Sequence, residues 1–323
     1  MRKWIDKASA LALLLSLAEL PAMAQQRPQY SQYFTNPFLL NPALAGTAAG
    51  MDARIGMRLQ WVGFRDAPRS FYGTFHTRVG ESRKRFFAKN QIEPRYYHGF
   101  GAQVMNDITG PTSRTTANVS YAFNQALTRT IRAGLGASIG LQQFSLSGSD
   151  LRYSNGPSGV VQPFSRVFPD ASIGLWVYSK HVFVGGSMQQ LFRNTFNAAD
   201  GQLGVYTAYR HGFATAGYNF TTKSDWTITP SMLVKIVKPA PVMVDVNLKA
   251  RYREQFWAGV SYRHQDAVVA AVGVGLGPFL DASYSYDIIT SDIAQYQRGT
   301  HELSLGLRLG QQRRTYNPPD FWR

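Results

Sequence analysis

Apolar and polar side chains alternate along most of this chain, and the alternation limits the folds that it can adopt. Between Val242 and Tyr252, every second residue is valine, leucine, alanine or tyrosine, and the residues between them are mostly charged or amide-bearing. Leucine takes every second position from Leu303 to Leu309. Because neighbouring side chains of a strand point to opposite faces of a sheet, these runs predict strands with one apolar and one polar face.

The runs are numerous and long. Many reach ten residues, which is the length that a tilted strand needs to cross a bilayer, whereas strands of soluble proteins usually have about five or six residues. Their even number and the near absence of helical patterns predict an all-β fold, a transmembrane antiparallel β-barrel of about 14 strands over residues 51–310. A large soluble β-fold is the alternative, because its strands show the same alternation. The predicted strands are 51–62, 68–79, 97–106, 113–126, 130–145, 170–180, 181–190, 209–222, 226–237, 242–252, 255–264, 267–276, 278–287 and 300–310.

The joints between these strands alternate in length, as expected for a barrel whose two chain ends lie in the periplasm. The joints at 179–181, 253–255 and 277–278 are short, which predicts periplasmic turns. The long joints, which are predicted external loops, are 146–169, 190–208 and 288–299.

The first 24 residues have the features of an export signal. Basic residues precede an apolar stretch over 8–18, and Ala22-Met23-Ala24 has the small-x-small pattern of a cleavage site. The apolar stretch is shorter than the roughly 20 residues of a membrane-spanning helix. The sequence therefore predicts a signal peptide over 1–24, cleavage before Gln25, and a place in the outer membrane of a Gram-negative cell.

Composition narrows the class of protein further. The net charge is +15, which favours anionic lipids or acidic proteins as partners; for an exported chain we expect no nucleic-acid partner. The mean hydropathy is −0.22, and no apolar run after the signal approaches the length of a membrane helix. These values exclude a helical membrane protein but not a barrel, whose alternating strands average to a mildly polar value.

Two segments on the predicted periplasmic side have the composition of docking elements. The joint 80–95 is long and basic and contains two phenylalanines, and the tail 311–323 ends with an aromatic pair. A solvated turn is the alternative for the joint, and an aromatic signal for barrel assembly is the alternative for the tail. The predicted partner-binding residues are Arg83, Lys84, Arg85, Phe86, Phe87, Phe321 and Trp322.

Many charged residues lie on the polar faces of the last predicted strands. A charge on the lipid face costs about 2–4 kcal/mol near the middle of the bilayer, so these side chains are predicted to point into the lumen. They form either a ladder of cross-strand ion pairs or a grip on a segment folded back into the barrel. The predicted lumen charges are Lys235, Asp245, Lys249, Arg251, Arg263, Asp281, Asp287, Glu302 and Arg308.

Residues 25–50, between the signal and the first strand, contain two Asn-Pro pairs followed by Ala-Gly. Each proline biases the residue before it away from the helical region, which predicts an ordered, turn-rich segment. We expect buried tyrosine and phenylalanine to hold it and the segment to plug the lumen. The predicted plug residues are Tyr33, Asn36, Pro37, Asn41 and Pro42.

The sequence offers no clear site for chemistry. The six histidines are scattered without an i, i+4 pair, and cysteine is absent, so we expect no metal, no cofactor and no enzymatic activity. A passive outer-membrane porin is the main alternative function, and a membrane-embedded hydrolase is a third.

Six blocks occur in order along the chain: the Asn-Pro segment, Arg58-Leu59-Gln60-Trp61, 230–247, 256–263, Tyr284-Ser285-Tyr286-Asp287 and 299–306. Together these blocks resemble the PorP/SprF family, outer-membrane proteins of the type IX secretion system of Bacteroidetes. The joint 80–95 and the tail after residue 310 depart from the family pattern.

The resemblance implies an accessory barrel that supports export or surface attachment of cargo proteins such as gliding adhesins. It also implies contacts with periplasmic and outer-membrane components of the same machine, and no catalytic residues.

Overall fold

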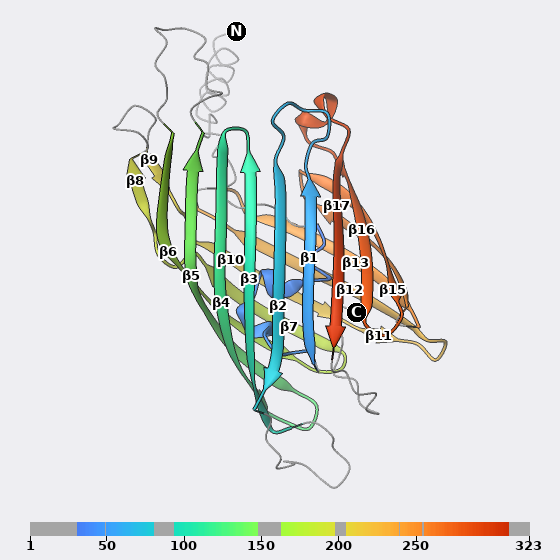
Figure 1. The fold of residues 1–323 in the computed structure, drawn as a ribbon. Helices are drawn as coiled ribbons and strands as arrows, with labels where there is room; N and C mark the ends of the chain where they lie inside the picture. Colours follow the sequence, from blue (N-terminus) through green and yellow to red (C-terminus); the bar gives the residue numbers. More distant parts are fainter. Residues whose placement is uncertain are drawn as a thin grey trace, which may run out of the picture.

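A closed antiparallel barrel dominates the computed structural model (Figure 1). The residues described are 31–48, 50–80, 94–147, 163–197, 205–238, 240–253 and 255–309. Among them, 14 long strands pair with their neighbours, β1 pairs with β17, and β10 pairs with both β7 and β12, which closes the sheet. The predicted all-β barrel of about 14 strands is therefore confirmed. The barrel strands are β1 (Met51–Leu59), β2 (Arg69–Val79), β3 (Tyr96–Thr109), β4 (Thr112–Ala126), β5 (Arg132–Leu146), β6 (Phe164–Tyr178), β7 (Val182–Gln189), β10 (His211–Tyr218), β12 (Trp226–Ile236), β13 (Met243–Tyr252), β14 (Phe256–Arg263), β15 (Ala267–Leu276), β16 (Leu280–Ile289) and β17 (Thr300–Leu309).

Short elements complete the described part of the chain. β8 (Thr195–Asn197) and β9 (Val205–Thr207) form a separate hairpin, and β11 (Phe220–Thr221) extends the pairing of β12. Three 3-10 turns are present, η1 (Pro37–Leu39), η2 (Pro42–Leu44) and η3 (Asp292–Tyr296). No helix in this part of the chain has the length and hydropathy to span a bilayer.

The two faces of the wall follow the alternation of the sequence. Leu135 and Ile139 of β5 are 65% and 66% exposed on the outer face, whereas Ser138 between them is buried on the inner face. In water such an outer face would expose far more apolar surface than soluble proteins tolerate, but a bilayer buries it. The same alternation places the polar side chains inside the barrel.

Because successive strands are antiparallel, the joints fall alternately at the two ends of the barrel. The "long-loop end" holds the joints that follow β1, β3, β5, β7, β12, β14 and β16. The "short-turn end" holds those that follow β2, β4, β6, β10, β13 and β15.

One predicted loop is partly wrong, since β6 already begins at Phe164 within the predicted loop 146–169. The cause is that Phe164 to Pro169 continue the ladder with β5 although their outer face lacks a regular apolar pattern.

Residues 31–48, here called the inner segment, lie inside the barrel, where Figure 1 shows their turns behind β2. Pro37 and Pro42 each occupy the first position of a 3-10 turn, and an asparagine precedes each of them at the N-cap position, where only the Asn41 side chain forms a capping hydrogen bond. Proline suits this position because its fixed φ is already helical and its missing N–H would have no partner there. The side chain of Asn41 accepts a hydrogen bond from the Ala43 amide at 2.9 Å.

Candidate functional site

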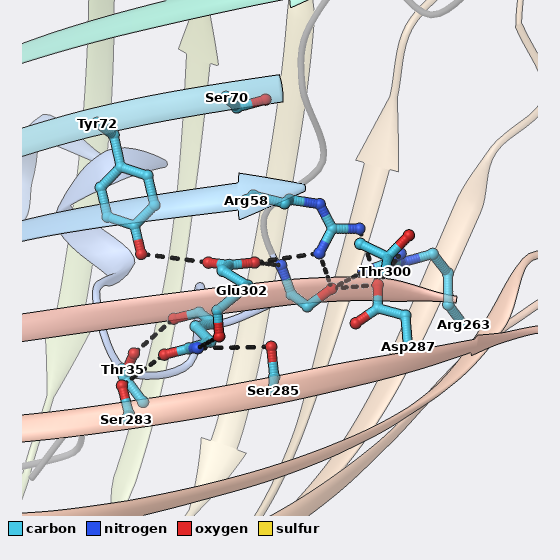
Figure 2. Close-up of polar contacts among 12 residues, drawn as sticks. Thr35, Arg58, Ser70, Tyr72, Arg263, Ser283, Ser285, Asp287, Thr300 and Glu302 are labelled. Atoms are coloured by element: carbon cyan, nitrogen blue, oxygen red, sulfur yellow. Dashed lines mark hydrogen bonds and ion pairs between the residues drawn. The ribbon is translucent and has the colours of Figure 1, made fainter. Parts of the chain in front are cut away.

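A buried ion-pair cluster joins the first strand to the last two strands. The two terminal nitrogens of the Arg58 guanidinium on β1 lie 2.8 Å from Asp287 on β16 and 3.1 Å from Glu302 on β17. Arg263 on β14 lies 3.7 Å from the same Asp287 carboxylate. We call these four residues the Arg58 cluster (Figure 2). Each charge in it faces an opposite charge, as a buried ionic site requires, and Arg263 also pairs with Asp266 at 3.0 Å and with Asp245 at 3.4 Å.

The strand register explains why this cluster forms. Arg58 lies directly opposite Glu302 in the β1–β17 pair, and Glu302 lies opposite Ser285 in the β16–β17 pair. Opposite charges at facing positions of an antiparallel pair attract each other. Tyr72 on β2 also points inward and donates a hydrogen bond to Glu302 at 3.2 Å (Figure 2). The cluster therefore depends on closure of the barrel, which brings the chain's first and last strands together.

Ser31 of the inner segment is bonded into the Arg58 cluster. Its amide donates to Glu302 at 2.8 Å and its hydroxyl donates to Asp287 at 2.6 Å. Arg58 in turn donates to the Ser31 hydroxyl at 2.6 Å. A single serine thus bridges both carboxylates and the guanidinium, with charge-assisted hydrogen bonds that are stronger than neutral ones.

Gln32 continues this attachment along β16 and β17. Its amide nitrogen donates to the Glu302 carbonyl at 2.8 Å and to the Ser285 hydroxyl at 3.4 Å. Its amide oxygen accepts a hydrogen bond from Ser283 at 2.5 Å. Both ends of the side chain are bonded, as a buried amide requires.

A second charged cluster lies nearer the short-turn end. Arg54 contacts Asp52 at 3.0 Å and Asp281 at 2.9 Å, and Arg308 contacts the same two carboxylates at 3.2 and 2.8 Å. These four residues, the Arg54 ring, alternate in charge and are neutral as a set. Asp52, Arg54 and Arg58 were not among the predicted lumen charges. The signal was available, because all three lie on the same face of the predicted strand 51–62 by sequence parity.

Five of the predicted lumen charges belong to these two clusters, and the other four lie elsewhere on the barrel wall. Asp287, Glu302 and Arg263 belong to the Arg58 cluster, and Asp281 and Arg308 belong to the Arg54 ring. Asp245 lies 3.4 Å from Arg263. The Lys249 ammonium lies 4.6 Å from the centre of the Trp257 ring, within cation–π distance. Lys235 and Arg251 are half-buried near the ends of β12 and β13. The ion pairs of the Arg54 ring connect strands of the barrel wall to each other. The Arg58 cluster also binds Ser31 of the inner segment.

The middle of the inner segment lies on three strands that have glycine at the point of contact. A Cβ atom on Gly99, Gly136 or Gly174 would overlap Ala45, Ala43 or Asn41, respectively. At Gly99 and Gly136 glycine is needed because the two backbones approach more closely than any side chain allows, and at Gly174 the Asn41 side chain occupies the space. η2 thus lies against β4, β5 and β6, and Ala45, the residue after η2, lies against β3.

Hydrogen bonds from polar side chains also hold Leu40 and Asn41 of the inner segment against the wall. Asn41 donates to the carbonyls of Leu175 at 3.0 Å and Gly186 at 3.2 Å. In the opposite direction, Ser187 and Gln189 of β7 donate to the Leu40 carbonyl at 2.6 and 2.8 Å. Hydrogen bonds therefore run both ways between the segment and the wall.

Aromatic packing completes the attachment. Tyr33 is buried against Phe213 and Leu233, and its hydroxyl accepts a hydrogen bond from Asn247 at 2.6 Å. Beside it, a cavity of about 30 Å³ lies between the inner segment and β7, β10 and β12, enough for about one water molecule.

Replacing Gly136 by valine is expected to lower the free energy of unfolding by about 1–3 kcal/mol, the usual cost of overpacking a close contact. The new side chain would collide with the backbone of Ala43. Urea unfolding in lipid vesicles measures the change. Gly73→Val is the matched control, because a Cβ at Gly73 has no neighbour within 4 Å. Equal stability of both variants would contradict the close contact.

Some predicted sites lie outside the described residues. These are the signal peptide 1–24, the tail 311–323 with Phe321 and Trp322, and Arg83 to Phe87 of the basic joint. Their roles stay predictions. In the described part of the chain, no group of three or more His, Asp or Glu side chains could hold a metal ion.

The sequence from Gly136 to Gly140 matches the Gly-x-Ser-x-Gly pattern of hydrolase nucleophile elbows. That pattern requires a sharp turn between a strand and a helix. Here it lies within the unbroken strand β5, and Ser138 is buried on its inner face. The match therefore reflects alternation of small residues in a strand rather than an elbow.

A closed barrel of long strands with an apolar outer face and a polar inside defines an outer-membrane β-barrel protein. One solved structure has a similar fold. A Pseudomonas aeruginosa FadL homologue has a TM-score of 0.50 at 12% identity, covering 89% of this chain and 96% of that one. The Pseudomonas putida toluene transporter TodX has a TM-score of 0.44 at 10% identity, covering 84% of this chain and 92% of that one. At these identities the likeness concerns the fold alone.

Comparison of the sequence with known protein families identifies the family of this chain. The family described as "Type IX secretion system membrane protein PorP/SprF" matches residues 22–307, which include the inner segment and nearly the whole barrel. The chain belongs to this family. No curated protein sequence matches it.

Proposed function

We propose that this protein is a non-enzymatic outer-membrane component of the type IX secretion system, which supports export or surface attachment of cargo proteins such as gliding adhesins. Membership of the PorP/SprF family supports the assignment to this system. The protein acts through contacts with secreted cargo and with periplasmic and outer-membrane components of the machine.

The proposal that the protein acts by binding other proteins, and not as a channel, rests on the inner segment, which occupies the lumen. The inner segment acts as a plug, with Tyr33, Asn36, Pro37, Asn41 and Pro42 among the residues that hold it. Its attachment to β16 and β17 by Ser31 and Gln32 supports a permanent position. A passive porin needs a continuous aqueous path, and a plug held by buried ion pairs and glycine contacts argues against one.

The proposed docking side is the short-turn end. The basic joint with Arg83, Lys84 and Arg85 follows β2 there, and the tail with Phe321 and Trp322 follows β17 there. We propose that these residues, with Phe86 and Phe87, bind a periplasmic component of the system. A basic surface favours an acidic partner and accelerates its association.

Replacing Arg83, Lys84 and Arg85 together by serine tests the proposal. Cargo at the cell surface is expected to fall toward the level of a strain that lacks the protein, while the amount of folded barrel in the outer membrane stays unchanged. Immunoblots of surface cargo and affinity purification from outer membranes measure the effect. Arg65→Ser at the opposite end is the control, because its side chain is 96% exposed and should not affect docking. Normal cargo export in a strain that lacks the whole protein would overturn the proposed function.

A further inference from the structure

The inner segment begins at the long-loop end of the barrel. Ser31 contacts Arg58, Asp287 and Glu302. Arg58 is one residue before the end of β1, Asp287 is two residues before the end of β16, and Glu302 is the third residue of β17. All three positions adjoin joints of the long-loop end.

The inner segment finishes at the short-turn end. The carbonyls of Gly46 and Thr47 accept hydrogen bonds from Arg78 at 3.0 and 3.1 Å, and Gly46 packs against Gly99. Arg78 is one residue before the end of β2, and β3 begins only three residues before Gly99. From there the chain enters β1 at Met51.

Contacts of the segment with β2 lie between these two ends, and Leu39 packs back against Tyr72, which is paired with Gly56. Asn36 donates to Thr74 at 2.9 Å, and Thr74 is paired with Arg54. The Phe38 ring lies 5.0 Å from the His76 ring, and His76 is paired with Asp52. The segment thus passes the levels of residues 58, 54 and 52 of β1 in turn, a descent of about 20 Å along the strand.

We infer that the protein is threaded through its own barrel, so that the amino end of the mature chain is presented at the long-loop end. The inner segment is then one more crossing in addition to the 14 strands. Because β17 runs from the long-loop end to the short-turn end, the two ends of the chain lie on opposite sides of the membrane. An even-stranded barrel without this crossing would have both ends on one side.

The long-loop end therefore gains an accessible chain terminus beside two joints that are already held together. Val62 after β1 exchanges backbone hydrogen bonds with Arg298 and Gly299 before β17, at 2.8 and 2.9 Å. A partner that recognises the amino end would bind on this side, across the membrane from the basic joint. The inference rests on the fold and does not depend on the proposed secretion role.

The absence of cysteine from the chain permits a direct test. Three single-cysteine variants are compared: Gln26→Cys, Arg65→Cys as the marker of the long-loop end, and Lys180→Cys as the marker of the short-turn end. Intact cells, and then lysed cells, are treated with a membrane-impermeant maleimide. Gln26→Cys is expected to label under the same conditions as Arg65→Cys, whichever end faces outward, and under different conditions from Lys180→Cys.

Labelling of Gln26→Cys together with Lys180→Cys would overturn the threading. Labelling only after denaturation would also overturn it, because the amino end would then be enclosed. Altered electrophoretic mobility of the unheated protein checks that each variant is folded. Arg65 and Lys180 are exposed, so the two marker variants should not disturb the buried clusters. An epitope inserted before Arg27, probed with antibody on intact cells, provides a second measurement if a cysteine variant fails to fold.

Discussion

Deletion of residues 31–45 is expected to convert a barrel with almost no conductance into an open channel. The deleted residues occupy the lumen between the Arg58 cluster and η2, and the wall closes through β10 without them. The 14-stranded wall keeps its hydrogen bonds, and water fills the emptied interior. Conductance in planar bilayers measures the change, and we expect an increase of at least about tenfold because side chains no longer fill the barrel.

The control for this deletion is Arg65→Ala, which changes an exposed side chain outside the lumen and should leave conductance low. If the intact protein conducted as well as the deletion variant, the plug would be excluded and the porin alternative would be favoured. If the deletion variant stayed closed, another part of the chain would have to fill the lumen.

Arg58→Met is expected to lower the free energy of unfolding by about 3–5 kcal/mol, the cost of leaving buried charges without their partner. Asp287 and Glu302 are 0% and 1% exposed, and both would lose their contact with the guanidinium. Urea unfolding in lipid vesicles measures the loss. Arg65→Met is the control, since Arg65 pairs with Asp66 in solvent, where an ion pair contributes less than about 1 kcal/mol.

A double variant, Arg58→Met with Glu302→Gln, separates charge from packing. It removes the Glu302 carboxylate, which has lost its guanidinium partner, whereas Asp287 keeps Arg263 at 3.7 Å, so the double variant should regain part of the lost stability. If the double variant were as unstable as the two single losses added together, the damage would come from packing rather than from buried charge.

The barrel was predictable because its governing pattern is local. A period of two along each strand determines which side chains face lipid, and no knowledge of the partner strands is needed. The Arg58 cluster was not fully predictable, because it depends on register between strands that are far apart in the sequence. Tyr72 illustrates the limit: alternation with Ser70 and Thr74 already places it on the inner face, but its hydrogen bond to Glu302 on β17 depends on closure of the barrel.

The structure of the inner segment was likewise predictable only where it depends on neighbouring residues. Its turns follow from the two Asn-Pro pairs, which act within a few residues. Its direction through the barrel depends on Ser31 and Gly46 meeting opposite ends of the wall, and no local pattern encodes that. Likewise, Gly99, Gly136 and Gly174 become a common contact surface only after β3, β5 and β6 are assembled.

The bond between Ser31 and Glu302 has a consequence for the order in which the protein matures. These residues are 271 positions apart, so the part of the chain made first acquires its final contacts only after the part made last is present. Contacts of such long sequence separation form slowly, and the exposed intermediate is prone to aggregate. The Arg58 cluster, which holds Ser31, likewise forms only when β1, β16 and β17 are all present. We therefore expect a holding chaperone to keep the amino-terminal region accessible until the carboxyl-terminal strands arrive.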